Sequence, residues 1–180
     1  TCYKDIAFGP KNMGLDEAEI DRRVHEAADF VGLDPALLER SPFELSGGQK
    51  RRVAVAGVMA MKPRILVLDE PAAGLDPEGR DDILSEVKEY HKKTGTTVLL
   101  VSHSMEDIAK YVERLIVMNH GEMVFDDTPK NVFSHYKELE GMGLAAPQIT
   151  YIMHALSENG LNVDTTATTV EEARDTILEA

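Results

Sequence analysis

The first 44 residues carry apolar side chains at helical spacing. Four of them lie three or four positions apart and therefore share one helix face: Ile20, Val24, Ala27 and Val31. Asp16 and Glu19 have the spacing of an N-terminal capping box, and Gly32 is a typical helix stop. A second short helix is predicted over residues 34–40, which begin with Asp-Pro. Residues 1–44 are therefore predicted to form a helical arm.

In the middle of the chain, short apolar runs flank a helical pattern. Residues 65–68 are apolar and partly β-branched, which is typical of a strand buried on both faces of a parallel sheet. Residues 97–101 form a second such run, and residues 80–93 between them are predicted to be helical. Since such a connection is right-handed and joins parallel strands, both strands are expected to end at one edge of the sheet. The pattern predicts an α/β fold.

The remaining third alternates short elements with turns. It is predicted to contain a helix over 105–111, a hairpin that pairs 115–118 with 123–125 around Asn119-His120-Gly121, a linker over 141–147, and helices over 148–158 and 170–178. The predicted organisation has three segments: the arm (1–44), a core (45–140) and a small C-terminal accessory domain (141–180). Such a domain is typical of self-association or regulation, but a solvated helical cap on the core is an equally good interpretation.

Composition narrows the function classes. The net charge is −13, and residues 126–180 contribute −7 of it. No basic stripe or aromatic platform stands out, which argues against a nucleic-acid partner. No apolar run approaches the roughly 18–20 residues that a transmembrane helix needs. Cys2 is the single cysteine, so an internal disulfide is excluded and a reducing compartment is favoured.

The segment around Ser46 carries the first candidate chemistry. Ser46 and Gln49 have capping-box spacing, so a helix is expected to begin at about Gly47. With Gly47 and Gly48 in its first turn, its N–H groups and dipole are open to an anion. Five basic residues and no acidic one follow between positions 45 and 68, which suits a polyphosphate: Lys50, Arg51, Arg52, Lys62 and Arg64. Taken alone, Ser-Gly-Gly is also typical of a flexible turn before a helix.

Two acids follow the first predicted strand directly. Asp69 and Glu70 stand where that strand leaves the carboxyl edge of the sheet, the usual ligand edge of open α/β sheets. Asp69 is placed to hold Mg²⁺, directly or through water, because Mg²⁺ prefers hard oxygen ligands and keeps much of its hydration. Glu70 is placed to orient or deprotonate an attacking water. Without further context, a structural role for both acids is about equally plausible.

Four segments together resemble the motifs of ABC-type ATPases. They are LSGGQ at 45–49 (the signature), ILVLDEP at 65–71 (Walker B with its glutamate), GLD at 74–76 (the D-loop) and Ser102-His103 (the switch histidine). Residues 5–15 and the short tail after Gly141 also resemble the ATPases of energy-coupling-factor importers, the cobalt and vitamin type.

This resemblance implies a fold, a site and partners. The implied fold is a partial P-loop NTPase (RecA-like) core with a helical subdomain. Two copies or two paralogues would sandwich ATP and Mg²⁺, so that the turn of Ser46, Gly47, Gly48 and Gln49 meets nucleotide bound by the other subunit. In each subunit Asp69 would hold Mg²⁺ through water, Glu70 and His103 would be catalytic, and Asp76 would contact the second subunit.

The resemblance also implies a membrane system. A transmembrane coupling subunit would dock on the arm, and a substrate-binding membrane subunit would be engaged indirectly, at the cytoplasmic face of the cell membrane. Residues 3–15 are the expected docking segment, because Phe8-Gly9-Pro10 and Met13-Gly14-Leu15 place apolar groups on a stretch with little helical pattern. The motifs do not specify the transported substrate or distinguish a homodimer from a heterodimer.

Two motifs of the family are not found in the sequence. There is no Gly-Lys dipeptide and hence no P-loop of the form G-x-x-x-x-G-K-[ST], and no glutamine precedes the signature turn. The chain is therefore expected to be the carboxyl-terminal part of a longer ATPase and to be inactive alone. Two alternatives remain: an ABC ATPase with no role in transport, and a partner-binding fragment without catalytic activity.

Overall fold

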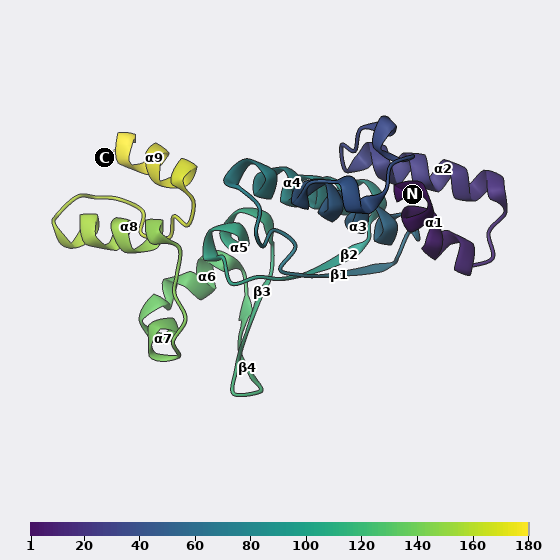
Figure 1. Ribbon diagram of the computed structural model, residues 1–180. Helices are drawn as coiled ribbons and strands as arrows, with labels where there is room; N and C mark the ends of the chain where they lie inside the picture. The colour runs from purple at the N-terminus through teal and green to yellow at the C-terminus, as the bar shows by residue number, and fades with distance from the viewer. Residues whose placement is uncertain (180) are drawn as a thin grey trace. The chain divides into compact units, whose positions relative to one another are not determined.

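The computed structural model describes residues 1–179, which form two compact units. The first unit is Thr1–Val101, and the second begins at Ser102. The first contains, in chain order, α1 (Cys2–Asn12), α2 (Glu17–Phe30), short 3₁₀ turns at Pro35–Leu37 and Pro42–Glu44, α3 (Gly47–Met59), β1 (Ile65–Asp69), α4 (Pro77–Thr94) and β2 (Thr97–Val101) (Figure 1). The three predicted segments divide the chain differently, and that division stays a prediction.

The start of the arm is an α-helix, so the expectation of little helical pattern there was wrong. Thr1 caps α1, and its buried residues recur at helical spacing: Cys2, Ile6, Ala7 and Pro10. The helix lies close to α3 and to the turn after it, because a Cβ added to Gly9 would lie 3.6 Å from the Gly57 carbonyl oxygen of α3 and 2.5 Å from the Met61 side chain. Gly9 and Pro10 obscured the helix in the sequence, since neither favours a helix interior. Tertiary packing overrides that local preference.

The helices α2 and α3 begin where predicted, but at α2 only the Asp16 half of the capping box is seen, because the Glu19 carboxylate binds Arg22 and Arg23. The Asp16 carboxylate accepts from the Glu19 N–H at 2.8 Å, and α2 runs on to Phe30. The segment predicted as a short helix over 34–40 contains only a 3₁₀ turn, Pro35–Leu37, capped by Asp34. The buried faces of α1, α2 and α3 meet in one apolar core, which also takes in Leu66 and Leu68 of β1 and Val87 and Tyr90 of α4.

The two strands of this unit are parallel and in the predicted order. Ile65 pairs with Thr97 and Asp69 pairs with Val101, so β1 and β2 end at the same edge (Figure 1). Burial on both faces is not observed. Leu66 and Leu68 are buried, but Ile65 and Val67 on the other face are 61% and 63% exposed. Helix α4 crosses between the strands and covers only the buried face, because one crossover helix covers one side of a sheet.

Helix α4 is longer than predicted. It begins at Pro77, since the Asp76 carboxylate caps it by accepting from the Gly79 N–H at 2.8 Å. It ends at Thr94 and is followed by the capping residue Gly95, which has a left-handed φ of 69°.

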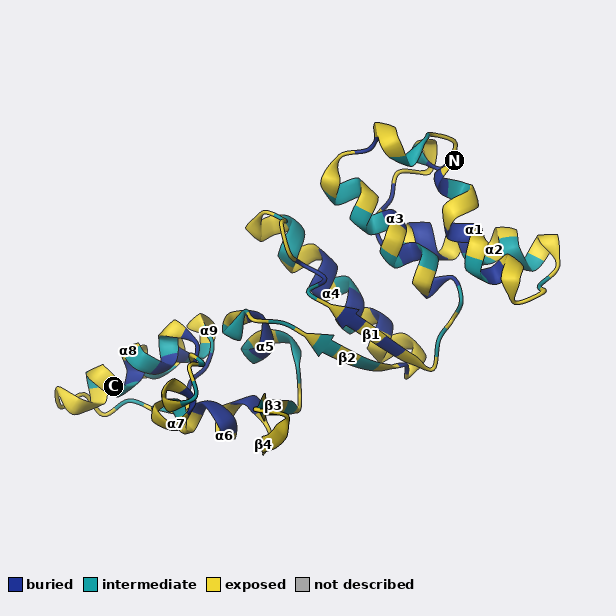
Figure 2. Ribbon diagram, turned by 60° about the horizontal axis from the view of Figure 1, so that its bottom comes forward, coloured by how far each residue is buried: buried dark blue, intermediate teal, exposed yellow. Residues whose placement is uncertain are grey.

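The second unit combines a hairpin with short helices. Its elements are α5 (Met105–Tyr111), β3 (Leu115–Asn119), β4 (Glu122–Asp127), α6 (Pro129–Ser134), α7 (Tyr136–Gly141), α8 (Gln148–Glu158) and α9 (Val170–Glu179). The predicted hairpin is confirmed, with positive φ at His120 and Gly121 as a tight primed turn requires. Helices α6 and α7 were not predicted. They bury Val132, Phe133 and Leu139 in the core of this unit, together with Ile108 of α5 and Val117 of β3. The buried part of α6 is dark blue in Figure 2.

Candidate functional site

The turn at Ser46 has the predicted geometry. The Ser46 hydroxyl accepts from the Gln49 N–H at 3.3 Å, and the Gln49 side-chain oxygen accepts from the Ser46 N–H at 3.0 Å. The first intrahelical bond of α3 runs from the Lys50 N–H to the Ser46 carbonyl at 2.9 Å. The N–H groups of Gly47 and Gly48 precede that bond and form the positive end of the helix dipole.

Neither glycine of this turn is required by the described part of the chain. A Cβ added at Gly47 would meet no described atom within 4 Å, and one at Gly48 would meet only Leu75 Cδ2 at 3.8 Å, an ordinary contact. Neither residue has the positive φ that favours glycine. Neither packing nor backbone conformation within the described chain therefore requires glycine at these positions. Without side chains there, the N–H groups at the start of the helix are open to a phosphate group.

The two acids lie at the end of β1. Asp69 is exposed and is the last residue of the strand, paired with Val101. Glu70 is half-buried and has a φ of 47°, which is unusual for a residue with a side chain. Its N–H donates to the Val101 carbonyl at 2.9 Å. A left-handed conformation costs roughly 1–2 kcal/mol outside glycine, so its surroundings must hold Glu70 in place.

Arg51 of α3 is part of those surroundings. Its guanidinium donates to the Ala73 carbonyl at 3.0 Å and, through its other terminal nitrogen, to the Glu70 carbonyl. The Leu75 side chain of the same loop lies near Gly48, 3.8 Å from where a Cβ would stand. These contacts could not be predicted from the sequence, because a long arginine side chain can reach many acceptors that are distant along the chain.

Asp76 caps helix α4, so its carboxylate already has an intramolecular partner. The turn that leads to it is tight, with a φ of 74° at Gly74 and a bond from the Leu75 N–H to the Ala72 carbonyl at 3.3 Å. The predicted contact of Asp76 with a second subunit is untested and stays a prediction.

His103 belongs to the second unit and is exposed. It follows Ser102, whose hydroxyl accepts from the Ser104 N–H at 3.1 Å. The parallel register is confirmed, but Asp69 and Glu70 belong to the other unit. The pairing of His103 with the acids therefore stays a prediction.

Two of the five basic residues of positions 45–68 bind acids of this chain. Arg52 binds Glu86 at 2.8 Å and Asp82 at 3.0 Å, and Lys62 binds Glu26 at 3.0 Å. Burial raises the pKa of Glu86, while the neighbouring Arg52 charge opposes that shift. Lys62 follows the far end of α3, about 20 Å from Gly47 at 1.5 Å per residue. Charge counting along the chain overestimated the local positive field.

The end of β1 offers Mg²⁺ a single carboxylate ligand, that of Asp69. No group of three or more His, Cys, Asp or Glu side chains able to hold a metal occurs within residues 1–179. Mg²⁺ commonly takes only one or two protein carboxylates and completes its shell with water and substrate phosphates. The exposed Asp69 carboxylate meets that requirement.

A groove between α1 and α3 offers an apolar surface. Its volume is about 560 Å³, and its lining includes Phe8, Met13, Val53, Val58 and Met61. Phe8 and Met13 are 68% and 52% exposed. The docking segment predicted over residues 3–15 therefore does present apolar side chains to the surface. No helix among residues 1–179 combines the length and apolar character needed to cross a membrane.

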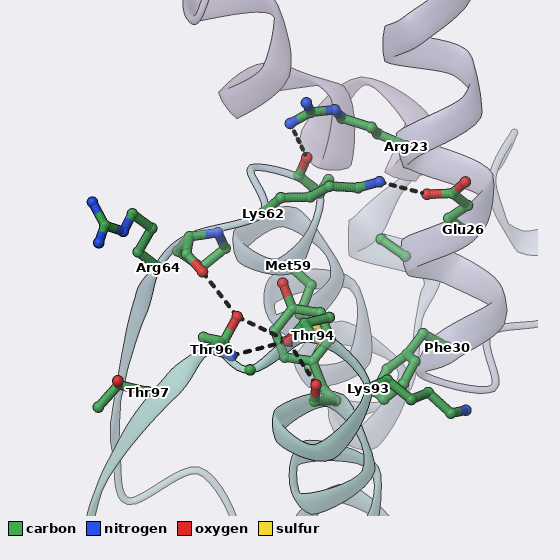
Figure 3. A pocket seen from close by; sticks show the side chains of 15 residues that line it. Arg23, Glu26, Phe30, Met59, Lys62, Arg64, Lys93, Thr94, Thr96 and Thr97 are labelled. Atoms are coloured by element: carbon green, nitrogen blue, oxygen red, sulfur yellow. Dashed lines mark hydrogen bonds and ion pairs between the residues drawn. The ribbon is translucent and has the colours of Figure 1, made fainter.

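A larger hollow of about 630 Å³ lies where the two strands begin, at the opposite end of β1 from Asp69 (Figure 3). Lys62 reaches toward Glu26 across it, and the Thr96 hydroxyl donates to the Pro63 carbonyl at 3.0 Å. Its cations are largely engaged: Lys62 by Glu26, Arg23 by Glu19 at 2.6 Å, and Lys93 over the Phe30 ring. This hollow is separate from the acids and the glycine turn.

Comparisons with known proteins agree with this geometry. Residues 3–73 match the family model described as "ABC transporter". The chain is 54% identical over 180 residues to the energy-coupling factor transporter ATP-binding protein EcfA2 of Clostridium tetani, covering 99% of this chain and 62% of that protein. It is 51% identical to EcfA2 of Clostridium perfringens, covering 99% and 63%. The chain thus spans about three fifths of the length of these relatives.

Solved structures give the same result. CbiO1 from Clostridium perfringens, described as part of the ABC transporter complex cbiONQ, matches with a TM-score of 0.70 and 36% identity, over 87% of this chain and 61% of that one. The dimeric bacterial ABC transporter cassette MJ0796 matches with a TM-score of 0.56 and 30% identity, over 64% of this chain and 49% of that one.

Proposed function

Because the chain belongs to the ABC-type ATPases of the energy-coupling-factor kind, we propose that it supplies the signature turn and the catalytic acids of an ATP-hydrolysing subunit that energises a membrane importer. The observation that carries the proposal is that the signature turn and the two acids lie on the same unit. The helix that begins at the glycine turn is joined to the loop after Asp69 and Glu70 by the hydrogen bonds of Arg51 to the Glu70 and Ala73 carbonyls.

The glycine turn acts on nucleotide bound by a second ATPase subunit. Gly47 and Gly48 let phosphate approach the helix N-terminus, while Ser46 and Gln49 fix the first turn of α3 through their reciprocal bonds. Fixed N–H donors stabilise negative charge without having to reorganise during the reaction. Asp76 lies beside this surface as the cap of α4 and is proposed to contact the second subunit.

The acids act on the nucleotide of their own subunit. Asp69 would hold Mg²⁺ through a water ligand, and the ion would neutralise phosphate charge. Glu70 accepts a proton from the attacking water and orients it. His103 senses the phosphate from the end of the neighbouring strand. Closure of the two subunits excludes water from the site.

The groove between α1 and α3 is the proposed dock for a transmembrane coupling subunit. Phe8 and Met13 are apolar and exposed, and the groove between their helix and α3 offers a concave apolar surface for a helix of the partner. Through that subunit the chain would act indirectly on a substrate-binding membrane subunit, at the cytoplasmic face of the membrane. The proposed cargo is a metal ion or a vitamin.

The test uses the full ATPase, meaning this chain joined to a phosphate-binding loop of the G-x-x-x-x-G-K-[ST] type. It is co-expressed with energy-coupling-factor membrane subunits, and Mg-ATP hydrolysis and uptake into proteoliposomes are measured. Co-purification with ATP-dependent uptake is expected. Hydrolysis without any association with membrane subunits would contradict the transport role, and absence of hydrolysis would contradict the enzymatic one.

A further inference from the structure

The guanidinium of Arg51 joins two parts of the site that the motifs treat separately. Arg51 lies on α3, five residues after the Ser46 cap, and so moves with the turn that is proposed to meet the second subunit's nucleotide. Its two terminal nitrogens donate to the carbonyls of Glu70 and Ala73 in the loop that follows the catalytic strand. Both acceptors are backbone atoms of one short turn.

That turn fixes the backbone of the proposed catalytic base. The Glu70 carbonyl accepts from the Ala73 N–H at 3.1 Å as well as from Arg51, and the Glu70 N–H donates to the Val101 carbonyl at 2.9 Å. The φ of 47° at Glu70 sets the direction in which its side chain leaves the chain. Without Arg51, Glu70 would be less firmly held in this left-handed conformation, and an extended conformation is lower in energy for a residue with a Cβ.

We propose that Arg51 is a positioning residue that couples the signature helix to Glu70 of the same subunit. Displacement of the helix N-terminus by a second subunit's nucleotide is passed through α3 and the planar guanidinium to the peptide of Glu70. The Leu75 side chain of this loop also lies near Gly48, since a Cβ added at Gly48 would be 3.8 Å from Leu75 Cδ2. Arg51 does not touch the reacting atoms. The coupling rests on the proposed ATPase function. The hydrogen bonds from Arg51 to the Glu70 and Ala73 carbonyls, called the clamp below, do not depend on that function.

The kinetic test compares Arg51→Gln and Arg51→Lys in the full ATPase. For Arg51→Gln, kcat should fall by roughly 10- to 100-fold, because a misplaced catalytic group costs about that much, while KM for Mg-ATP stays nearly constant. Arg51→Lys should recover part of kcat, since its ammonium can reach one carbonyl but cannot span two. The control is Lys92→Gln, which removes an equal charge from the exposed Lys92–Glu89 pair on α4.

The structural test uses hydrogen exchange on residues 1–180. Arg51→Gln should speed exchange of the Ala73 amide, while the amides of α3 keep their protection, which shows that the chain still folds. Unchanged exchange at Ala73 would overturn the clamp. A normal kcat, or a loss confined to KM, would overturn the coupling. If the unaltered full ATPase and Lys92→Gln both fail to hydrolyse ATP, the proposed function and the coupling fail, and the exchange result still decides the clamp.

Discussion

Replacing Gly48 by aspartate separates the role of the glycine turn in this chain from its proposed role toward a second subunit. Within the described chain, the new Cβ would meet only Leu75 Cδ2 at 3.8 Å, and the backbone does not require glycine. Aspartate has a somewhat better helix propensity than glycine, by a few tenths of a kcal/mol. A negative charge in the first turn adds about 0.3–1 kcal/mol through the helix dipole. The free energy of unfolding should therefore stay constant or rise by about 1 kcal/mol.

The same substitution is expected to weaken binding to nucleotide held by a second subunit. A carboxylate about 4 Å from a phosphate charge is repelled by roughly 1 kcal/mol in water and roughly 4 kcal/mol at an effective dielectric of 20. ATP-dependent association should therefore weaken by about 5- to 1,000-fold per site. Each full-length subunit keeps its own affinity for ATP, because the turn is proposed to belong to the other subunit's site.

The assay is sedimentation of the full ATPase with and without Mg-ATP, together with nucleotide titration and thermal unfolding. Ala18→Asp is a matched control, because Ala18 is exposed and is the second residue of α2, as Gly48 is of α3. Ala18→Asp should be folded and should associate normally. Undiminished association of Gly48→Asp, or a loss of nucleotide affinity in the isolated subunit, would refute action on a second subunit.

Other perturbations test separate parts of the molecule. Phe8→Asp should abolish co-purification with the transmembrane subunit and leave basal ATPase unchanged. Val170→Asp, also exposed, should leave both co-purification and basal ATPase unchanged; a complex retained by Phe8→Asp would contradict the dock. Arg22 and Arg23 hold the pKa of Glu19 at about 2, below its usual 4.5, so Glu19 stabilises the fold above pH 4.5 and loses that effect as the pH falls to about 2. The melting temperatures of wild type and Glu19→Gln should therefore converge across that window, and a constant gap would count against the ion pairs. Residues 1–180 alone should show no Mg-ATP turnover and at most very weak calorimetric binding; tight binding would mean that the chain builds a phosphate site from other residues.

Local chemistry made much of the fold predictable. The capping residues Ser46 and Asp16 set helix starts through bonds within three residues, which a sequence displays directly. The apolar runs at 65–68 and 97–101 and the helix between them determined a parallel pair, because the connection permits few alternatives. The turn at His120-Gly121 was predictable in the same way, because it requires positive φ values and glycine adopts them readily.

The sequence predictions failed where the structure depends on contacts between residues far apart in the chain. Helix α1 contains Gly9 and Pro10, and only its fit against Met61 explains why glycine is accommodated there. Helices α6 and α7 are six residues each, too short for a periodicity to register. Arg51 and Arg52 have adjacent positions and identical chemistry, yet Arg51 binds carbonyls of the loop after β1, whereas Arg52 binds Glu86 and the Val31 carbonyl. Nothing local to those positions separates the two outcomes.

The central claim is that Asp69 and Glu70 form the hydrolytic edge of an ATPase, and Glu70→Gln in the full ATPase tests it most directly. The substitution leaves Asp69 and the glycine turn unchanged, so ATP binding measured by titration should stay within a few-fold of wild type. Phosphate release should fall by at least the roughly 10²- to 10⁴-fold that loss of a general base costs. Turnover near the wild-type rate would contradict the assignment of Glu70 and the account of the site built on it.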